Sequence, residues 1–281
     1  MPSRATAGAR SILRRCQDQR VNRIFSFANH AFSTASTDEP FYGRPRVPQS
    51  KQPRSIQNRL AVAIHYATTA FSDPTRADAV AALGEITGPV TLRRLAQQMK
   101  QNPVGKRILQ DRPVVSKATI PYEKFIAEAP KDHVNHPDVT FGQAYGFFLN
   151  SHEFDPDERD DVRFVEDEEL AYIMLRYRQC HDYWHTLTGL PPTVLGELGL
   201  KWLELFQTGL PIAALSSTVG SLRLDPDERE ILLEQYLPWA LEQSRNMTTS
   251  LLNVYYEEEF DTPLIELRER LNIQPAPEVA K

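Results

Sequence analysis

Apolar residues recur every three to four positions along most of this 281-residue chain, which is the spacing of amphipathic helices. Runs that alternate between apolar and polar residues, as a strand would, never exceed about five residues. No segment repeats with a period of about 20 to 50 residues, and no apolar run reaches the roughly 18 residues that a membrane span needs. The pattern predicts an all-α fold that forms a single multi-helix domain.

The same pattern and its interruptions predict where the helices lie. Residues 113–138 contain four prolines and are expected to be mostly loop. The helix from 167 is expected to run without a break to Thr188, because Gly189-Leu190-Pro191-Pro192 cannot continue it. The expected helices are 58–71, 75–83, 91–100, 106–109, 141–149, 167–188, 193–207, 213–222, 227–243 and 263–271.

Composition places the chain among ordinary globular proteins. Hydrophobic residues make up 41% and charged residues 25%, so a buried core can form and wholesale disorder is excluded. The two cysteines, Cys16 and Cys180, cannot build a disulfide framework, which indicates a reducing compartment. Cys180 is expected to be a buried core side chain and not a metal ligand.

Positive charge is concentrated in the first 37 residues. This segment holds six arginines, no lysine and one aspartate, and it lacks a long apolar stretch, a make-up typical of a mitochondrial presequence. A disordered basic tail and a nucleic-acid-binding arm are the alternatives. We predict a presequence over 1–37, a proline-rich linker over 38–56, the helical domain over 57–273 and a tail over 274–281.

The remainder of the chain is acidic, with a net charge of −10 in an overall balance of −5. A surface of that sign does not attract phosphate backbones or anionic lipids as a whole, so no nucleic-acid partner is expected. Any membrane contact would need a local patch. The apolar segments 58–71 and 210–215 are candidates for membrane or subunit contact, although each also fits plain core.

Two histidines and two carboxylates are spaced so that they can meet between neighbouring helices. His181 and His185 stand one turn apart and about 40° apart around a helix, and Asp182 lies about 100° from His181. The turn 189–192 is short enough to send the next helix back antiparallel, which would bring Glu197 to the same place. We predict a metal site formed by His181, Asp182, His185 and Glu197. This donor set suits Zn²⁺ best, with Fe²⁺, Co²⁺ or Mn²⁺ possible.

Simpler interpretations of the same residues stay open. Two partly buried histidines with Asp182 near a helix end would give this pattern without a metal. Tyr177 and Trp184 could line an apolar ligand site, or they could belong to the core. Gly196 and Gly199 could let a ligand tail approach, or they could be contacts between packed helices.

The residues around the four predicted ligands resemble the coenzyme Q (ubiquinone) biosynthesis protein 4 family. His181-Asp182-x-x-His185, eleven further residues and then Glu197 are similar to the zinc motif of that family, and the likeness covers roughly residues 41–273. It extends through Ala81-Ala82-Leu83-Gly84-Glu85-Ile86-Thr87-Gly88, Thr140-Phe141-Gly142, Arg163-Phe164-Val165, Glu169-Leu170-Ala171-Tyr172, Arg176-Tyr177-Arg178, His185-Thr186-Leu187, Leu200-Lys201-Trp202, Gln207-Thr208-Gly209-Leu210-Pro211 and Tyr236-Leu237-Pro238-Trp239-Ala240.

The resemblance implies an all-α, zinc-binding mitochondrial protein on the matrix side of the inner membrane, held there peripherally. It implies partners as well, namely the other ubiquinone-biosynthesis proteins of a multi-protein complex. The implied activity is that of a carbon-carbon lyase, either oxidative or non-oxidative, that removes the ring carboxylate of a polyprenylated hydroxybenzoate, 4-hydroxy-3-methoxy-5-polyprenylbenzoate. The product would be 2-methoxy-6-polyprenylphenol.

Two other functional classes are compatible with these residues. A non-enzymatic scaffold, or a component that presents polyprenyl lipids to the complex, would use the metal to pin two helices together. A metal-dependent phosphohydrolase with a His-Asp doublet is the other. That class needs a further distant histidine and aspartate, and it does not use a histidine one turn on or a glutamate in the next helix.

Overall fold

The computed structural model describes residues 82, 84–128, 136–158, 162–221 and 224–279. Helices dominate these ranges, and within them the one extended pairing is an isolated antiparallel bridge between Thr140 and Pro263. The predicted all-α class is therefore confirmed. The helix expected over 58–71 lies outside the described residues, as do the predicted presequence and linker and all of the helix expected over 75–83 except residue 82, which is helical.

Connections of varying length separate the described helical elements. In chain order they are α4 (Pro89–Gln101), α5 (Pro103–Asp111), α6 (Tyr122–Ala127), α7 (Phe141–His152), η2 (Pro156–Glu158), α8 (Glu168–Gln179), α9 (His181–Thr188), α10 (Val194–Thr208), α11 (Pro211–Ser221), α12 (Pro226–Ile231), η3 (Leu232–Tyr236), α13 (Leu237–Asn246), η4 (Leu251–Asn253), η5 (Tyr256–Glu258) and α14 (Leu264–Leu271).

Side-chain caps and glycines set several of these ends. The Thr193 hydroxyl accepts the backbone N–H of Gly196 and begins α10. Gly189 and Gly209 end α9 and α10 in the left-handed conformation, at φ +72° and +64°. The short helix α6 interrupts the segment 113–138, which its prolines predicted to be mostly loop.

The helix expected to run from 167 to Thr188 is broken, and this prediction was wrong. α8 ends at Gln179 and α9 begins at His181, because the backbone at Cys180 has ψ −5° instead of the helical value near −42°. Neither proline nor glycine marks the break. Gln179 is instead tied to the backbone of Val115 by two bonds of 3.2 Å, a distant contact that the sequence does not reveal.

The segment expected as a helix over 227–243 is a continuous helical run with one π turn, η3, between α12 and α13. The π turn ends at Tyr236, whose ring packs directly against Gly199 in α10. A single turn of this kind redirects a helix and its side chains. Here it brings an aromatic ring against the helix that carries Glu197.

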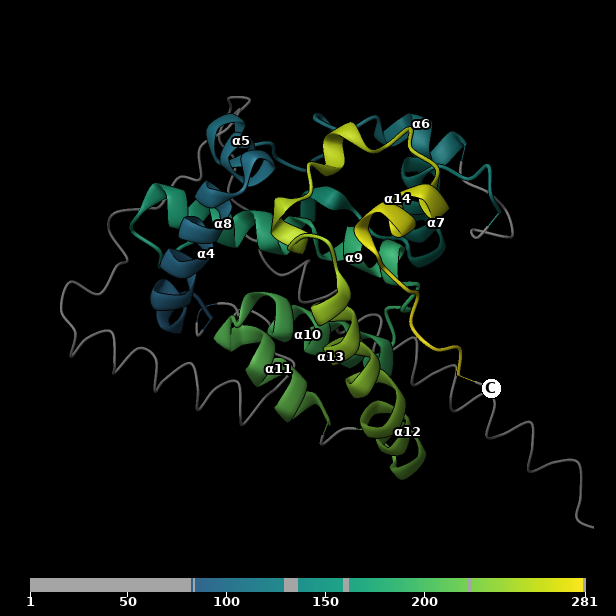
Figure 1. Cartoon of the computed structure of the whole chain (residues 1–281). Coiled ribbons are helices and arrows are strands. Elements are labelled where there is room, and N and C mark those ends of the chain that lie inside the picture. Colours follow the sequence, from purple (N-terminus) through teal and green to yellow (C-terminus); the bar gives the residue numbers. More distant parts are fainter. Residues whose placement is uncertain (1–81, 83, 129–135, 159–161, 222–223, 280–281) are drawn as a thin grey trace, which may run out of the picture.

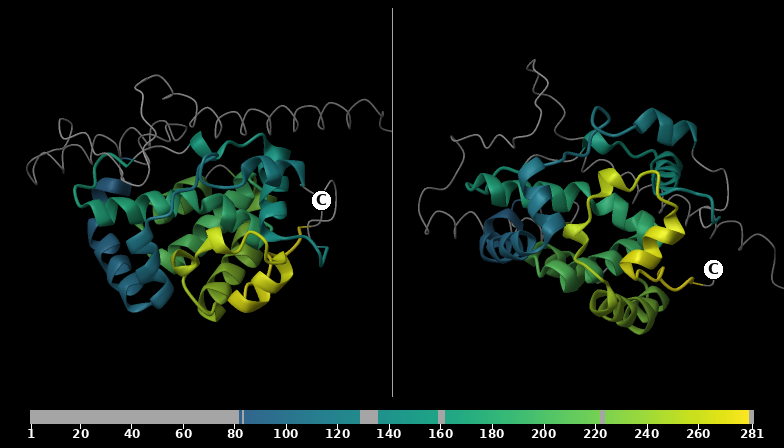
Figure 2. Two further views of the ribbon diagram at one scale, coloured as in Figure 1. Left: turned by 90° about the horizontal axis from the view of Figure 1, so that it is seen from above. Right: turned by 45° about the horizontal axis from the view of Figure 1, so that its top comes forward.

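α9 lies in the middle of the molecule (Figure 1). α10, α11 and α13 form one group beneath it, α7 and α14 lie on one side, and α4, α5 and α8 lie towards the other. The turned views show the same arrangement, with α4 and α14 at opposite ends (Figure 2). Every residue of α9, from His181 to Thr188, is buried.

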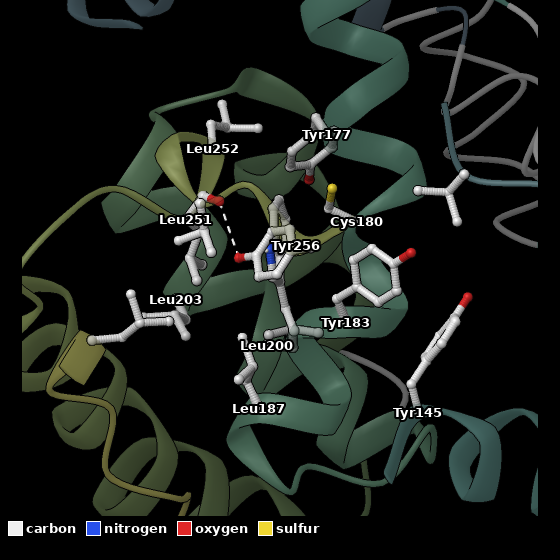
Figure 3. Packing of buried hydrophobic residues seen from close by; sticks show 14 of the residues in the cluster. Tyr145, Tyr177, Cys180, Tyr183, Leu187, Leu200, Leu203, Leu251, Leu252 and Tyr256 are labelled. Carbon is white, nitrogen blue, oxygen red and sulfur yellow. Dashed lines mark hydrogen bonds between the residues drawn. The ribbon is translucent and has the colours of Figure 1, made fainter. Parts of the chain in front are cut away.

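Aromatic side chains fill the core beside α9. Tyr183 packs edge-on against Tyr145 at a ring-centroid distance of 4.6 Å and tilts against Tyr256 at 5.2 Å (Figure 3). The Tyr256 hydroxyl donates to the carbonyl of Leu251 and accepts the indole N–H of Trp184, each at 3.0 Å. These contacts hold α9 rigidly, because a buried aromatic ring with a satisfied polar tip cannot shift without losing both packing and hydrogen bonding.

Candidate metal centre

α9 carries polar and ionisable residues into the interior, where each needs a partner. Burial of an unpaired polar group costs free energy, so such groups persist only when they are hydrogen-bonded or bind a ligand. The carbonyls at the end of α9 are satisfied by Arg268, which donates to Leu187 at 2.8 Å and to Thr186 at 3.1 Å. The imidazole nitrogens of His181 and His185 need partners as well.

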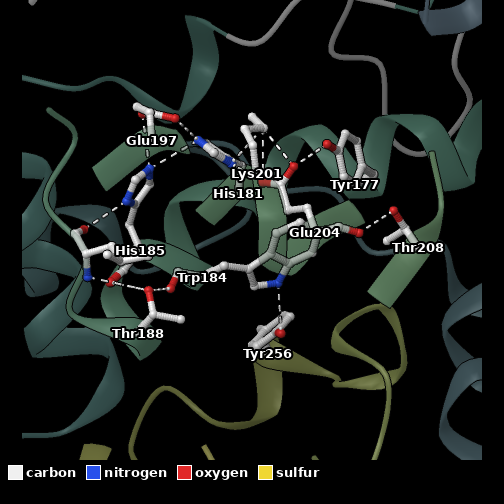
Figure 4. Close-up of polar contacts among 11 residues, drawn as sticks. Tyr177, His181, Trp184, His185, Thr188, Glu197, Lys201, Glu204, Thr208 and Tyr256 are labelled. Atoms are coloured by element: carbon white, nitrogen blue, oxygen red, sulfur yellow. Dashed lines mark hydrogen bonds and ion pairs between the residues drawn. The ribbon is translucent and has the colours of Figure 1, made fainter. Parts of the chain in front are cut away.

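Three side chains converge on one point between α9 and α10. The Nε2 atoms of His181 and His185 lie 3.2 Å apart (Figure 4). One oxygen of the Glu197 carboxylate lies 3.1 Å from Nε2 of His181, and the other lies 3.1 Å from Nε2 of His185. The potential ligand atoms of His181, His185 and Glu197 all lie within 4.8 Å of one another. The structure thus brings together three of the four residues that the sequence singled out.

The far nitrogen of each imidazole is already committed. His185 donates its Nδ1 proton to the backbone carbonyl of Leu190 at 2.8 Å, since a carbonyl can only accept. The Nδ1 of His181 lies 2.6 Å from a carboxylate oxygen of Glu204, which in its ionised form can only accept. In both neutral rings the Nε2 lone pair therefore points at Glu197. Lone pairs facing one another in a buried place require a cation, either a proton or a metal ion.

The spacing of these atoms fits the tetrahedral coordination of a zinc ion. A tetrahedral Zn²⁺ with bonds of about 2.0 Å holds its ligand atoms about 3.3 Å apart. The two imidazole Nε2 atoms lie 3.2 Å apart, and each lies 3.1 Å from a different oxygen of Glu197. Nitrogen and oxygen donors do not select zinc sharply over Fe²⁺, Co²⁺ or Mn²⁺.

Asp182, the fourth predicted ligand, is buried in the first turn of α9. Its carboxylate is not in the cluster formed by the other three side chains. The helical geometry explains this, because Asp182 is about 100° around the axis from His181, whereas His185 is only about 40° away. Its assignment as a ligand stays a prediction.

Glu204 and Lys201 belong to the site although the sequence analysis did not single them out. The Lys201 ammonium donates to both carboxylate oxygens of Glu204, at 2.8 and 3.0 Å, and the Tyr177 hydroxyl donates to the same carboxylate. A signal was present in the sequence. Glu197, Lys201 and Glu204 are spaced i, i+4 and i+7, which puts all three on one face of α10.

Charge pairing keeps these carboxylates ionised in spite of their burial. Burial raises the pKa of Glu197, but His185 and His181 lower it by more, and it ends well below its usual value. Burial also raises the pKa of Glu204, while Lys201 and His181 bring it down to about 2. For His181, burial and Lys201 lower the pKa, and the two glutamates raise it above its usual value.

Other residues near the motif are core. Tyr177 and Trp184 are buried with their ring centroids 5.6 Å apart, and Tyr177 joins the site only through its hydroxyl, which bonds to Glu204. A Cβ added at Gly196 would lie 2.0 Å from the carbonyl oxygen of Pro191, and one at Gly199 would lie 2.8 Å from the ring of Tyr236. These two glycines therefore allow close packing of the chain itself. Of the apolar segment 210–215, Leu210 is fully buried.

A comparison with known proteins identifies the family. The family model described as coenzyme Q (ubiquinone) biosynthesis protein Coq4 matches residues 49–277. The chain belongs to the Coq4 family. It is 42% identical over 225 residues to the mitochondrial ubiquinone biosynthesis protein COQ4 homolog of Bos taurus, an alignment that covers 80% of this chain and 82% of that protein. The resemblance drawn from the sequence is confirmed, and the chain is a ubiquinone-biosynthesis protein.

Two further relatives extend the comparison. The mitochondrial ubiquinone biosynthesis protein COQ4 of Paracoccidioides brasiliensis is 39% identical over 263 residues, 92% of this chain and 87% of that protein. The crystal structure of a candidate ubiquinone biosynthesis protein from Nostoc punctiforme shares the fold, with a TM-score of 0.57 at 18% identity, over 76% of this chain and 95% of that one. In the described part of this chain, no helix is long and apolar enough to cross a membrane.

Proposed function

We propose that the chain is a metal-dependent carboxy-lyase of ubiquinone biosynthesis. It removes the C1 carboxylate of 4-hydroxy-3-methoxy-5-polyprenylbenzoate and gives 2-methoxy-6-polyprenylphenol. The observation that carries the proposal is the convergence of the Nε2 atoms of His181 and His185 with the Glu197 carboxylate at 3.1 to 3.2 Å, in a family devoted to ubiquinone biosynthesis.

His181, His185 and Glu197 would hold the ion, which we propose to be Zn²⁺. When bound, it supplies positive charge to the carboxylate or phenol oxygen of the substrate. Glu197, Lys201 and Glu204 together carry one net negative charge when the imidazoles are neutral. A bound divalent cation would reverse that sign, and with Asp182 protonated, as its role below requires, the site would favour an anionic ligand such as an aromatic carboxylate.

The reaction needs one proton and releases one carbon dioxide. The bond between the ring carbon and the carboxylate carbon breaks, its electron pair stays on the ring carbon, and a proton takes the vacated position. We assign delivery of that proton to Asp182, which is buried in the first turn of α9 beside His181. His181, held by Glu204, keeps its orientation throughout.

The setting is also part of the proposal. The chain acts in the mitochondrion, on the matrix side of the inner membrane, in a complex with other ubiquinone-biosynthesis proteins. Support comes from relatives that are named as mitochondrial ubiquinone biosynthesis proteins. A peripheral contact with the membrane suits a substrate whose polyprenyl tail partitions into lipid.

The test is product analysis by mass spectrometry. The full chain, loaded with zinc, is incubated with a short-tailed 4-hydroxy-3-methoxy-5-prenylbenzoate. Glu197→Gln removes a proposed ligand, and Glu234→Gln makes the same chemical change at an exposed glutamate in η3. Loss of carbon dioxide with the wild type and with Glu234→Gln, and none with Glu197→Gln, is the expected result.

The nature of the product refines the result. Hydrogen at the vacated carbon fits the proton transfer described above, whereas hydroxyl there would require an oxidant and contradict it. If Glu197→Gln decarboxylates as fast as the wild type, the proposed lyase site is wrong. A folded, zinc-loaded wild type that never turns over, alone or with its partner proteins, would favour the scaffold instead.

A further inference from the structure

The carboxylate of Glu204 contacts His181 on the side of the ring that faces away from the cluster of His181, His185 and Glu197. The Nδ1 atom of His181 lies 2.6 Å from Glu204, on the side of the ring opposite to Nε2. The Glu204 side chain is fully buried, with 0% exposure. A buried carboxylate is costly unless every partner is in place, so its presence behind this ring requires an explanation.

Glu204 is itself fixed on two sides. Lys201, one turn earlier in α10, donates to both of its oxygens, and Tyr177 from α8 donates to one of them. Lys201 also lies 3.3 Å from Nδ1 of His181. An ammonium can only donate hydrogen bonds, so Lys201 cannot accept the Nδ1 proton of His181. That proton goes to the nearer carboxylate oxygen of Glu204, and Lys201 neutralises the charge of Glu204.

These contacts determine which nitrogen of His181 carries the proton. With an anionic acceptor at Nδ1, the neutral ring keeps its proton on Nδ1 and its lone pair on Nε2, towards Glu197 and His185. Without that acceptor the proton would move readily to Nε2, where it could bond to the Glu197 oxygen 3.1 Å away. The ring would then have no lone pair for a metal ion.

We propose that Glu204 is a positioning residue that holds His181 in its Nδ1–H tautomer and presents its Nε2 to a divalent metal, with Lys201 and Tyr177 holding Glu204 in place. This inference deepens the proposed function and rests on it only in assuming that the cluster binds a metal. Carboxylates placed behind metal-binding imidazoles raise ligand basicity and fix ring orientation, and their loss weakens metal binding by about 10–100-fold.

Two measurements on the full chain test this role without an activity assay. The first is the tautomer of His181 in the metal-free protein, from long-range ¹H–¹⁵N correlation of the imidazole at a pH high enough to keep the ring neutral, because the two glutamates raise its pKa. The second is the zinc dissociation constant, from competition with a chromophoric chelator. Glu204→Gln keeps the size of the side chain but removes its charge, and Tyr177→Phe removes one hydrogen bond to Glu204 while keeping the ring.

Tyr183→Phe is the matched control for Tyr177→Phe. It also deletes a buried tyrosine hydroxyl, that of a residue in α9 itself. This hydroxyl has no hydrogen-bond partner among the described residues. We expect Glu204→Gln to populate the Nε2–H tautomer and to weaken zinc binding about 10–100-fold. Tyr177→Phe should change both quantities in the same direction to a smaller extent, and Tyr183→Phe should change neither.

An unchanged tautomer and unchanged zinc affinity in Glu204→Gln would overturn the inference while leaving the metal centre intact. If Glu204→Gln does not fold, Tyr177→Phe decides, and equality with Tyr183→Phe overturns the inference. A wild-type chain that binds no divalent metal would instead overturn the proposed function. The two failures are therefore distinguishable.

Discussion

His185 donates its Nδ1 proton to the backbone carbonyl of Leu190, 2.8 Å away, within the turn that joins α9 to α10. The turn therefore orients an imidazole in addition to reversing the chain. The backbone N–H of Leu190 donates to the Thr188 hydroxyl at 3.4 Å, and that hydroxyl donates to the backbone carbonyl of Trp184 at 2.7 Å. The ring of His185 is thus held by the end of its own helix.

Substituting Gly189→Ala should destabilise the protein and weaken metal binding together. Gly189 has φ +72°, and a Cβ there would meet nothing closer than 4.0 Å, so the cost arises from the backbone conformation alone. A left-handed alanine costs about 1–2 kcal/mol. Any relaxation of that strain would move the neighbouring carbonyl of Leu190 away from His185. Urea unfolding and zinc competition measure the two effects.

Gly209→Ala is the control for this substitution, because Gly209 ends α10 at φ +64°. It should lose comparable stability, with an added contact at the Arg94 guanidinium, and keep the wild-type zinc affinity. Equal zinc affinities in both variants would show that the turn does not orient His185.

Gly196→Ala should lower stability although alanine is the better helix former. Alanine gains about 1 kcal/mol from helix propensity. The new Cβ would lie 2.0 Å from the Pro191 carbonyl oxygen, a backbone atom that cannot swing aside, and overpacking of this kind typically costs about 1–3 kcal/mol. We expect a net loss of up to about 2 kcal/mol, measured by urea unfolding. A more stable variant would contradict the close contact.

Removing the metal should lower the thermal stability of the folded protein without unfolding it. An ion that binds only the native state adds about 2.7 kcal/mol at 100 times its dissociation constant. For a domain of this size, that is a rise in Tm of about 5–10 °C. Calorimetry with zinc and with a chelator should show this difference for the wild type and none for His185→Ala. An equal shift in both would place the ion elsewhere.

His152 should make stability fall in mild acid. Burial is the main reason why its pKa lies below the usual 6.5. As pH falls through about 6.5, the unfolded chain takes up a proton at this position before the folded protein does. Stability therefore declines from about pH 6.5 down to the lowered pKa of the folded state and is unaffected by this group above that window.

Replacing the histidine should remove this contribution. Urea unfolding in the presence of a chelator should show a smaller loss of stability between about pH 7.5 and 5 for His152→Gln than for the wild type. His136→Gln, which changes an exposed histidine, is the control. Identical pH profiles for the wild type and His152→Gln would contradict the assignment.

Local sequence signals predicted much of this architecture. The three- to four-residue spacing of apolar positions indicated helices, and Gly189 marked a helix end that the structure has. The break at Cys180 was not predictable, because distant contacts of Gln179 with Val115 accompany it and no local residue demands it.

The candidate site shows the same division. His181 and His185 share a helix face, and a short turn brings Glu197 to them, so their convergence followed from spacing. Glu204 was missed although its spacing puts it on the α10 face that carries Glu197, because its role depends on contacts with His181, Lys201 and Tyr177 in the fold. Asp182 lies on the same turn as His181 but outside the cluster, which spacing alone could not resolve.

The metal content of the purified full chain tests the account most directly. After equilibration with zinc and removal of the free ion, elemental analysis should find about one zinc per chain in the wild type and in Glu234→Gln. His185→Ala and Glu197→Gln should retain far less, with unchanged helical circular dichroism. A wild type without bound zinc, iron, cobalt or manganese, or variants that keep the full complement, would contradict the assignment of His181, His185 and Glu197 as a metal centre.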